Sequence, residues 1–539
     1  MLQKAVHEGE RSLLSGNEAV ALAACHAGVR LGTGYPGTPS TEILETFSRL
    51  GGDARWSPNE KVALEVGLGA AFGGGRALVT MKHVGLNVAA DPLFTAAYTG
   101  VSGGLVIVSA DDPGMASSQN EQDNRRYAVA AGVPMLEPAD SQEAYDFTRK
   151  AFELSEFWRL PVILRMTTRV CHSKTVVEPR APAMNAPLPH FQRDLPARVM
   201  IPAYARPAHR RLREKLARLE GSAAEGWAWR VVEGEPELGV ITSGVSFMYV
   251  REAAPHASVL KFNLVHPLPV EVARRFRQKV QRCVVVEEGD PYLYEALRAA
   301  GIDVEPRPES HRFGELDVAR VRRFLAGEPE AVVERVAGKP PQLCEACPYH
   351  VVYKALQDRD CIVAGDIGCY TLGVLPPYQA MDTCVCMGAS IGVGLGLRHV
   401  LPPDQARRVV SVIGDSTFIH SGITGLVEMV YNPPPTGHVV IVLDNATTAM
   451  TGHQEHPGTG RQLNHEPTNR VVIEELARAL GIRRVHVVEP RSGSDTFARV
   501  LDACLEAQEL TVIVARRPCV LVAKRLRELD KRAAALNAR

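Results

Sequence analysis

The sequence predicts an α/β protein of several domains, built on parallel sheets with helices packed on their faces. Three stretches of chain alternate short β-branched runs with helical patterns, which is typical of parallel α/β layers. Strand-like runs occur at residues 76–81, 104–109 and 160–165 in the first stretch, and at 412–414 and 510–516 in the last. The length of 539 residues is enough for about three domains.

Local patterns define further elements. Residues 17–29 are predicted to form a helix with Asn17 as its N-cap. Residues 238–243 and 283–286 are predicted strands of the middle stretch. Residues 524–539 are rich in charge, which predicts a surface helix or a helix that contacts a partner.

These patterns divide the chain into three α/β segments joined by two connections. The first connection is rich in proline and contains a basic helical stretch at residues 210–219, and the second contains a Gly-Lys-Pro-Pro run. The predicted boundaries, in chain order, are 1–185 for the first segment, 186–235 for a connecting arm, 236–330 for the second segment, 331–342 for a linker and 343–539 for the third segment.

Composition excludes several classes of protein. The 61 Lys and Arg residues balance 61 Asp and Glu residues, so no charged surface for nucleic acid is indicated. No apolar run reaches the roughly 18 residues of a membrane span, and the first residues lack the apolar region of a secretory signal. We therefore expect a cytoplasmic protein without nucleic-acid or membrane partners. The 11 cysteines of such a chain are expected to be thiols, metal ligands or cluster ligands before disulfides.

Two predicted strand ends in the third segment carry oxygen ligands. Asp415 follows an apolar run that ends in Gly414, and Asn445 follows a second apolar run. Neighbouring parallel strands present their carboxyl ends at one edge of a sheet, where ligands bind, and Mg²⁺ commonly shares its oxygen ligands with phosphates. We predict a Mg²⁺ site formed by Asp415, the Asn445 side chain and the Thr447 carbonyl, with thiamine diphosphate as the cofactor. Two ordinary turns are the alternative.

Thiamine diphosphate needs an acid as well as a cation, because a carboxylate on N1′ of its aminopyrimidine promotes loss of the thiazolium C2 proton. Glu60 begins a helical run rich in Gly and Ala at residues 60–75, whose small side chains allow another backbone to approach. It also lies in a different segment from the predicted magnesium ligands. We therefore predict Glu60 as the activating acid, the alternative being a first-turn acid that only stabilises the helix dipole.

A loop and a strand end in the first segment carry polar groups suited to an anionic substrate. Residues 35–41, Tyr-Pro-Gly-Thr-Pro-Ser-Thr, lie between a predicted strand and a predicted helix. The hydroxyls of Thr38, Ser40 and Thr41 together with the helix N-terminus predict an anion site, although simple N-capping by Ser40 or Thr41 is also expected. Lys82 and His83 end another predicted strand, where they can neutralise a substrate and shuttle a proton. A purely structural His83 is the alternative.

With these residues in place, the chain resembles the α subunit of indolepyruvate:ferredoxin oxidoreductases, in the superfamily of 2-oxoacid:acceptor oxidoreductases. The resemblance extends over nearly the whole chain, and its motifs are long and occur in the family's order. They are residues 33–41, 59–65, 80–87, 365–373, 387–392, 414–417 and 447–454.

The resemblance implies a multidomain thiamine diphosphate-binding fold. In it, the first segment binds the pyrimidine, the third binds diphosphate and Mg²⁺, and the second is a transketolase-C-like domain between them. The loop that holds the carboxylate of the 2-oxoacid would consist of Tyr35, Pro36, Gly37, Thr38 and Ser40. Contacts to the cofactor are implied for Glu60, Gly365, Asp366, Gly368, Cys369, Gly414, Asp415, Ser416, Asn445 and Thr447.

The resemblance also implies an activity and partners. Aryl 2-oxoacids of the indolepyruvate type would be oxidatively decarboxylated to acyl-CoA, with Glu60, Lys82 and His83 as catalytic residues. A dimer of this chain would assemble with a smaller β subunit, of the catalytic-γ kind, into a heterotetramer. The sequence lacks the Cys-x2-Cys-x2-Cys-x3-Cys-Pro runs of the family's usual C-terminal ferredoxin-like domain, which leaves the electron acceptor open. A non-oxidative decarboxylase or carboligase, and a regulatory subunit with a vestigial site, are the alternatives.

Some of the cysteines are candidate cluster ligands. Related enzymes hold a [4Fe–4S] cluster near the cofactor, and the resemblance points to Cys344, Cys347 and Cys369 as its ligands. A cubane needs four ligands, normally thiolates, and no fourth is obvious, since Cys384 and Cys386 lie beside an apolar stretch. Ordinary buried or turn thiols are expected for Cys25, Cys171, Cys283, Cys361, Cys504 and Cys519.

Overall fold

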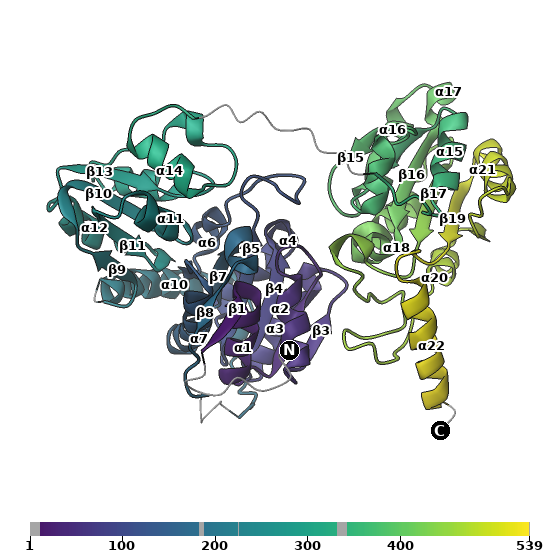
Figure 1. Ribbon diagram of the computed structural model, residues 1–539. Coiled ribbons are helices and arrows are strands. Elements are labelled where there is room, and N and C mark those ends of the chain that lie inside the picture. Colours follow the sequence, from purple (N-terminus) through teal and green to yellow (C-terminus); the bar gives the residue numbers. More distant parts are fainter. Residues whose placement is uncertain (1–10, 183–187, 225, 331–341, 538–539) are drawn as a thin grey trace. The chain divides into compact units, whose positions relative to one another are not determined.

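The computed structural model describes residues 11–182, 188–224, 226–330 and 342–537 (Figure 1). The chain separates into two compact units, Met1–Glu334 and Arg335–Arg539, and each is described by itself. The predicted linker at 331–342 lies outside the described residues except for Gln342.

The first unit is built on a seven-stranded sheet. Its strands, in spatial order, are β12 (Leu264–His266), β6 (Met135–Leu136), β7 (Val162–Thr167), β5 (Leu105–Asp111), β4 (Ala77–Lys82), β2 (Leu31–Gly34) and β3 (Ala54–Trp56). All neighbours pair in parallel except β12, which is antiparallel to β6. The predicted strands at 76–81, 104–109 and 160–165 are confirmed as β4, β5 and β7. Their continuous apolar runs fit a sheet that is covered on both faces.

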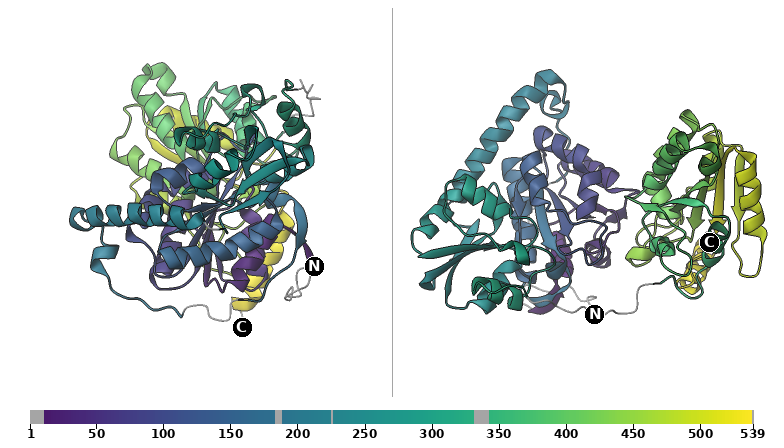
Figure 2. Two further views of the ribbon diagram at one scale, coloured as in Figure 1. Left: turned by 90° about the vertical axis from the view of Figure 1, so that its left-hand side faces the viewer. Right: turned by 90° about the horizontal axis from the view of Figure 1, so that it is seen from above.

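Helices cover both faces of this sheet (Figures 1 and 2). On one face α1 packs against α2 and α7; these helices span Gly16–His26, Thr41–Arg49 and Ser141–Trp158. On the other face α5 packs against α3 and α10; these span Ala90–Thr99, Glu60–Phe72 and Pro202–Ala223. The remaining elements are short: β1 (Ser12–Ser15) pairs with β8 (Lys174–Val177), and the helices are α4 (His83–Val88), α6 (Arg125–Ala131), α8 (Thr168–His172) and α9 (Leu195–Arg198).

A second, four-stranded sheet completes the first unit. Its strands, in spatial order, are β13 (Arg282–Val286), β10 (Glu235–Ser243), β11 (Ala257–Phe262) and β9 (Trp229–Val232). Its helical elements are α11 (Ser246–Ala253), α12 (Val270–Arg277), α13 (Tyr292–Ala299), η1 (Glu309–His311) and α14 (Val318–Leu325). Because β9 pairs with β11, this sheet begins before residue 236, inside the predicted connecting arm.

Buried ion pairs join the two sheets of the first unit. The Arg125 guanidinium, on α6, lies 2.8 Å from the Glu287 carboxylate, which follows β13. Arg165 of β7 pairs with Glu137, and Glu137 also accepts a hydrogen bond of 2.6 Å from Ser243 at the end of β10. Both arginines are fully buried. Buried charges are tolerated only when they are paired, so these pairs fix the second sheet against the first.

The first helix begins earlier than the sequence analysis predicts. Ser15 is the N-cap of α1: its hydroxyl accepts from the Glu18 amide at 3.2 Å, and the Glu18 carboxylate accepts from the Ser15 amide at 2.8 Å. The prediction of Asn17 as N-cap is therefore wrong, because a Ser-x-x-Glu capping box satisfies two amides at once. Asn17 instead lies buried inside the first turn and donates to the Pro39 carbonyl at 2.7 Å.

The second unit is built on a six-stranded parallel sheet. Its strands, in spatial order, are β15 (Thr383–Cys384), β14 (Ile362–Gly365), β16 (Val409–Gly414), β17 (His438–Asp444), β19 (Leu510–Arg516) and β18 (Arg484–Val488). Two separate apolar cores lie on its faces. One contains α15 (His350–Asp358) and α21 (Thr496–Ala507), and the other contains α16 (Ala389–Val400), α19 (Ile423–Tyr431) and α20 (Ile473–Ala479).

Short elements and the last helix complete this unit. They are η2 (Cys369–Val374), α17 (Pro403–Ala406), α18 (Asp415–Thr417), η3 (Phe418–Gly422), η4 (Ala449–Thr451) and α22 (Ala523–Asn537). The helix predicted at 524–539 corresponds to α22. Within the described part of the chain, every helix is too short or too polar to span a membrane.

Candidate active site

The predicted activating acid lies at the start of α3 in the first unit. Glu60 is the first residue of this helix, and the Asn59 side chain caps it by accepting from the Val62 amide at 2.9 Å. The Glu60 side chain is buried against α4, since a Cβ built on Gly85 would lie 2.6 Å from Glu60 Oε1. Any larger residue at position 85 would displace the carboxylate. Glu60 is therefore held in one place by the packing of two helices.

Lys82 and His83 stand at the junction between β4 and α4, beneath a polar loop. The Lys82 ammonium donates to the Ser117 carbonyl at 2.5 Å, and His83 Nε2 lies 3.1 Å from the Asn120 carbonyl. His83 is fully buried, and its Nδ1 has no hydrogen-bond partner among the described residues. Burial lowers the pKa of the His83 imidazole below its usual value, so the ring is neutral at pH 7.

Two amides of the polar loop hold the backbone under this histidine. Gln122 Nε2 and Asn124 Nδ2 donate to the His83 carbonyl at 2.9 and 3.1 Å. Asn124 also donates to the Ser109 hydroxyl of β5 at 2.7 Å. The signal for these residues in the sequence is a polar stretch that follows a buried strand.

The predicted substrate loop contacts Lys82. A Cβ built on Gly37 would lie 2.9 Å from Lys82 Cβ. The Ser40 hydroxyl donates to the Gly37 carbonyl at 2.9 Å, and the Thr41 hydroxyl accepts from the Gly37 amide at 3.0 Å. The expected N-cap bond by Ser40 does not form. Because Ser40 uses its proton within the loop, it shapes the loop, and the half-buried Thr38 is better placed to receive a carboxylate.

The predicted magnesium ligands in the second unit follow two adjacent strands. β16 and β17 pair in parallel up to Gly414 and Leu443, so Asp415 and Asn445 follow neighbouring strand ends. The Ala446 amide donates to Asp415 Oδ2 at 2.9 Å, which ties the second loop to the first. The Asn445 side-chain oxygen accepts from the Thr447 amide at 3.0 Å.

A histidine that the sequence analysis leaves without a role completes this arrangement. His456 is buried, and its Nε2 lies 3.2 Å from Asp415 Oδ2. The Thr448 hydroxyl donates to the Ser416 hydroxyl at 2.9 Å. Asp415, Ser416 and Thr447 are all buried at this edge of the sheet.

Asp366 organises the loops beside Asp415. Its carboxylate accepts three backbone hydrogen bonds, from Ile367 at 2.9 Å, Gly388 at 2.8 Å and Ser390 at 3.0 Å. These bonds hold the start of α16 against the end of β14. Burial nevertheless raises the pKa of the Asp366 carboxyl. Asp366 therefore positions backbone at this edge of the sheet, and its carboxylate is already occupied by amides.

At two of the predicted cofactor glycines, a side chain would clash with an aromatic ring. A Cβ on Gly368 would lie 2.3 Å from Tyr370, and a Cβ on Gly414 would lie 2.7 Å from the same ring. The Tyr370 hydroxyl donates to the Ile367 carbonyl at 2.9 Å. The two loops are thus packed together through Tyr370, at a spacing that only glycine permits.

The residues at these strand ends suit a cation that shares its ligands with phosphate. Among the described residues, no three His, Cys, Asp or Glu side chains are grouped as a complete metal site. The predicted set has one carboxylate, one amide oxygen and one carbonyl, which leaves room for diphosphate oxygens in the octahedral shell that Mg²⁺ requires. The donor chemistry therefore fits magnesium diphosphate.

Four cysteines line a cavity of about 150 Å³ beside the Asn445 loop. They are Cys344, Cys347, Cys369 and Cys519. The pKa of the Cys347 thiol is raised to about 11, mainly by burial and in part by repulsion of like charge from the other three cysteines. Cys519, which the sequence predicts to be an ordinary buried or turn thiol, is the fourth cysteine that lines this cavity.

The cysteine cavity and the magnesium loop share backbone. Asn445 itself lines the cavity, and the Cys519 amide donates to the Asn445 carbonyl at 2.9 Å. Cys369 follows the end of β14 and Cys519 follows the end of β19, so both lie at the carboxyl edge of the sheet that carries Asp415.

Comparisons with known proteins agree with this geometry. Residues 22–218 match the family model described as "Pyruvate flavodoxin/ferredoxin oxidoreductase, thiamine diP-bdg". Residues 366–515 match "Thiamine pyrophosphate enzyme, C-terminal TPP binding domain". The indolepyruvate oxidoreductase subunit IorA of Archaeoglobus fulgidus is 39% identical, over 97% of this chain and 89% of that protein. IorA of Methanothermobacter thermautotrophicus is 42% identical, over 95% of this chain and 88% of its own length.

The chain belongs to the IorA family of indolepyruvate oxidoreductase subunits. It is accordingly a thiamine diphosphate-dependent 2-oxoacid oxidoreductase, and the recognition made from the sequence motifs is confirmed. The predicted α/β fold is confirmed as well. A 2-oxoglutarate:ferredoxin oxidoreductase from Magnetococcus marinus has the same fold with a TM-score of 0.51, at 19% identity, over 59% of this chain and 65% of that one.

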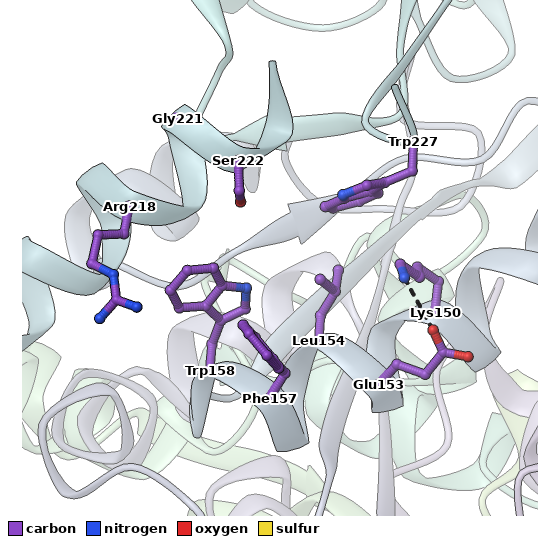
Figure 3. A pocket seen from close by; sticks show the side chains of 9 residues that line it. All are labelled: Lys150, Glu153, Leu154, Phe157, Trp158, Arg218, Gly221, Ser222 and Trp227. Carbon is purple, nitrogen blue, oxygen red and sulfur yellow. Dashed lines mark hydrogen bonds and ion pairs between the residues drawn. The ribbon is translucent and has the colours of Figure 1, made fainter. Parts of the chain in front are cut away.

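A larger cavity of this IorA-family chain is lined by none of the predicted site residues. It has a volume of about 650 Å³ and lies between α7 and α10 (Figure 3). Trp158 and Trp227 line it, and the Lys150–Glu153 ion pair of 3.0 Å stands at its edge. Trp158 is the last residue of α7, and β7 begins at Val162, so this cavity lies toward the amino end of that strand. The predicted ligands lie at carboxyl ends, where ligands of parallel α/β sheets bind.

Proposed function

We propose that the protein oxidatively decarboxylates aryl 2-oxoacids of the indolepyruvate type, forms acyl-CoA, and passes the electrons to an acceptor through a cluster held by its own cysteines. The cysteine cavity beside the Asn445 loop carries this proposal, because a non-oxidative decarboxylase needs no electron exit. Family membership supports the 2-oxoacid substrate, and the printed names of the relatives support indolepyruvate.

The first unit supplies groups for the aminopyrimidine and the substrate. Bound thiamine diphosphate supplies the carbon nucleophile for the 2-keto group and stabilises the charge left when CO2 departs. Glu60 holds the proton exchanged with N1′ of the aminopyrimidine. Thr38 and Lys82 orient and neutralise the substrate carboxylate, and the neutral His83, with its unpartnered Nδ1, can hold a proton beside them.

The second unit supplies the diphosphate site. Asp415, Asn445 and the Thr447 carbonyl would hold Mg²⁺, and His456 would orient the Asp415 carboxylate, as partners of metal ligands commonly do. A dimer of this chain is part of this proposal. A smaller second subunit is part of this proposal, since the relatives are themselves named as subunits.

A [4Fe–4S] cluster fits the cysteine cavity. Four cysteines line this one cavity, and a cubane normally takes four thiolate ligands. Iron would bind the cysteines as thiolates, because metals bind the deprotonated form. The Cys519 amide joins this site to the cofactor loop through the Asn445 carbonyl. Cys344, Cys347, Cys369 and Cys519 would be the ligands.

Replacing Cys519 by Ala tests the cluster directly. The wild-type complex, purified without oxygen, is expected to contain about four iron and four acid-labile sulfide ions per chain, and C519A to lose most of both. The matched control is C361A, because Cys361 is a half-buried thiol of the same unit that does not line the cavity. Wild-type protein without iron, or C519A with full iron content, would contradict the proposed ligand set.

Product analysis tests the reaction. The purified complex is given indolepyruvate or 2-oxoglutarate, with and without coenzyme A and an artificial one-electron acceptor. We expect acyl-CoA formation that requires both additions and a kcat/KM for indolepyruvate at least about tenfold higher, because an aromatic ring buries more apolar surface than a short acid. Aldehyde as the main product, formed without the acceptor, would replace the proposal with a non-oxidative decarboxylase.

A further inference from the structure

A buried tyrosine lines the cysteine cavity, and its hydroxyl is unsatisfied. Tyr349 directly precedes α15, two residues after the ligand candidate Cys347, and is only 4% exposed. Its ring lines the cavity together with the four cysteines. Its hydroxyl is buried and has no hydrogen-bond partner among the described residues.

Such a hydroxyl is expected to have a partner when the site is complete. An unpaired buried donor is costly, and native proteins rarely keep one. Neighbouring tyrosines show the contrast, because the Tyr353 hydroxyl donates to the Tyr370 carbonyl at 2.6 Å and the Tyr370 hydroxyl donates to the Ile367 carbonyl. Of these three tyrosines, Tyr349 is therefore the one whose hydroxyl proton remains available to a group bound in the cavity.

The surroundings of Tyr349 are buried and negatively charged. Burial raises the pKa of Tyr349 well above its usual value, and the Asp415 and Asp444 carboxylates add to the effect. The same influence of Asp415 shows that Tyr349 lies within electrostatic range of both the cysteines and the magnesium loop.

We propose that the Tyr349 hydroxyl donates a hydrogen bond to a sulfur of the cluster held by Cys344, Cys347, Cys369 and Cys519, and so raises the cluster's reduction potential. Hydrogen bonds to the sulfurs of a cluster tune its potential, and a donor stabilises the reduced state because that state carries more negative charge. Tyr349 thereby makes the cluster a better acceptor for electrons from the cofactor site. The inference rests on the proposed cluster.

The test compares the reduction potential of Tyr349→Phe with that of the wild-type complex, in a redox titration followed by electron paramagnetic resonance. Y349F is expected to keep its iron and sulfide. Its ratio of reduced to oxidised cluster at a fixed potential should fall about tenfold, which is a shift of about 59 mV to more negative potential for one electron. Full cluster content with an unchanged potential overturns the inference and leaves the cluster proposal standing, whereas iron-free wild-type protein overturns both.

Tyr353→Phe is the matched control. Tyr353 is fully buried on α15, loses a real hydrogen bond when truncated, and does not line the cavity. Y353F should therefore lower the melting temperature more than Y349F does and shift the potential less. The opposite ranking of the two variants in potential would count against a direct bond from Tyr349.

A measurement on the wild-type complex guards against misfolding of the variant. Electron–nuclear double resonance of the reduced cluster in D2O should show an exchangeable deuteron coupled to the cluster. The coupling should be lost in Y349F, because it arises from the Tyr349 hydroxyl and not from a solvent molecule or a backbone amide. No exchangeable deuteron near the cluster would overturn the inference.

Discussion

Glu60→Gln is expected to lower turnover by at least about 10³-fold, while thiamine diphosphate and Mg²⁺ still bind. Proton transfer by a positioned side chain contributes about 10²–10⁴-fold to enzymatic rates. The cofactor has to be deprotonated again in every catalytic cycle. Gln has nearly the same volume as Glu, so the contact with Gly85 that fixes the side chain is kept. Steady-state turnover of the complex and calorimetric titration with the cofactor measure the two effects separately.

The matched control for Glu60 lies on the same helix. Glu65 is an exposed acid of α3 that pairs with Lys61. E65Q should keep full turnover, since exposed ion pairs of this kind contribute little. Near-full activity of E60Q would show that another group activates the aminopyrimidine, even if the cofactor site itself is placed correctly.

Asp415→Ala is expected to weaken binding of thiamine diphosphate with Mg²⁺ by at least about 100-fold. The substitution removes the only carboxylate of the proposed ligand set, and even partners of metal ligands are worth about 10–100-fold in affinity. It also leaves the Ala446 amide and the His456 ring without their shared acceptor. Titration of the apo complex with the cofactor, at fixed Mg²⁺, measures the loss.

Two further variants separate charge from shape at this position. Asp415→Asn keeps an oxygen for the backbone amides but loses the negative charge, so it should bind the cofactor better than D415A and worse than wild type. Asp404→Ala removes an exposed acid of α17 in the same unit and should leave binding unchanged. If D415A binds the cofactor as tightly as D404A, then Asp415 is not a ligand.

The sequence predicts the strands of this fold well, because buried parallel strands are continuous β-branched runs. β16, β17 and β19 are of this kind, and the residues that follow the first two are the predicted oxygen ligands. Helix ends are harder, since a cap depends on one side chain. The first helix shows this, where Ser15 rather than Asn17 makes the capping bonds.

Contacts between distant parts of the chain are what the sequence does not reveal. Cys519 lies far along the chain from Cys369, and only the order of strands in the sheet brings their loops to one cavity. His456 likewise reaches Asp415 from a loop without regular structure. Residue type alone also misplaces the role of Ser40, whose hydroxyl is bonded within its own loop. The remaining candidate residues stay predictions until their variants are measured.

The hydrogen bond from the Cys519 amide to the Asn445 carbonyl has a consequence for electron tunnelling. Tunnelling rates fall steeply with the distance between electron donor and acceptor. If a flexible segment lay between the two groups, this distance would vary from one turnover to the next. Here Asn445, a proposed cation ligand, and Cys519, a proposed cluster ligand, are joined by a backbone hydrogen bond. The first electron hop would therefore keep a constant length, whatever the chain does when substrate enters or product leaves.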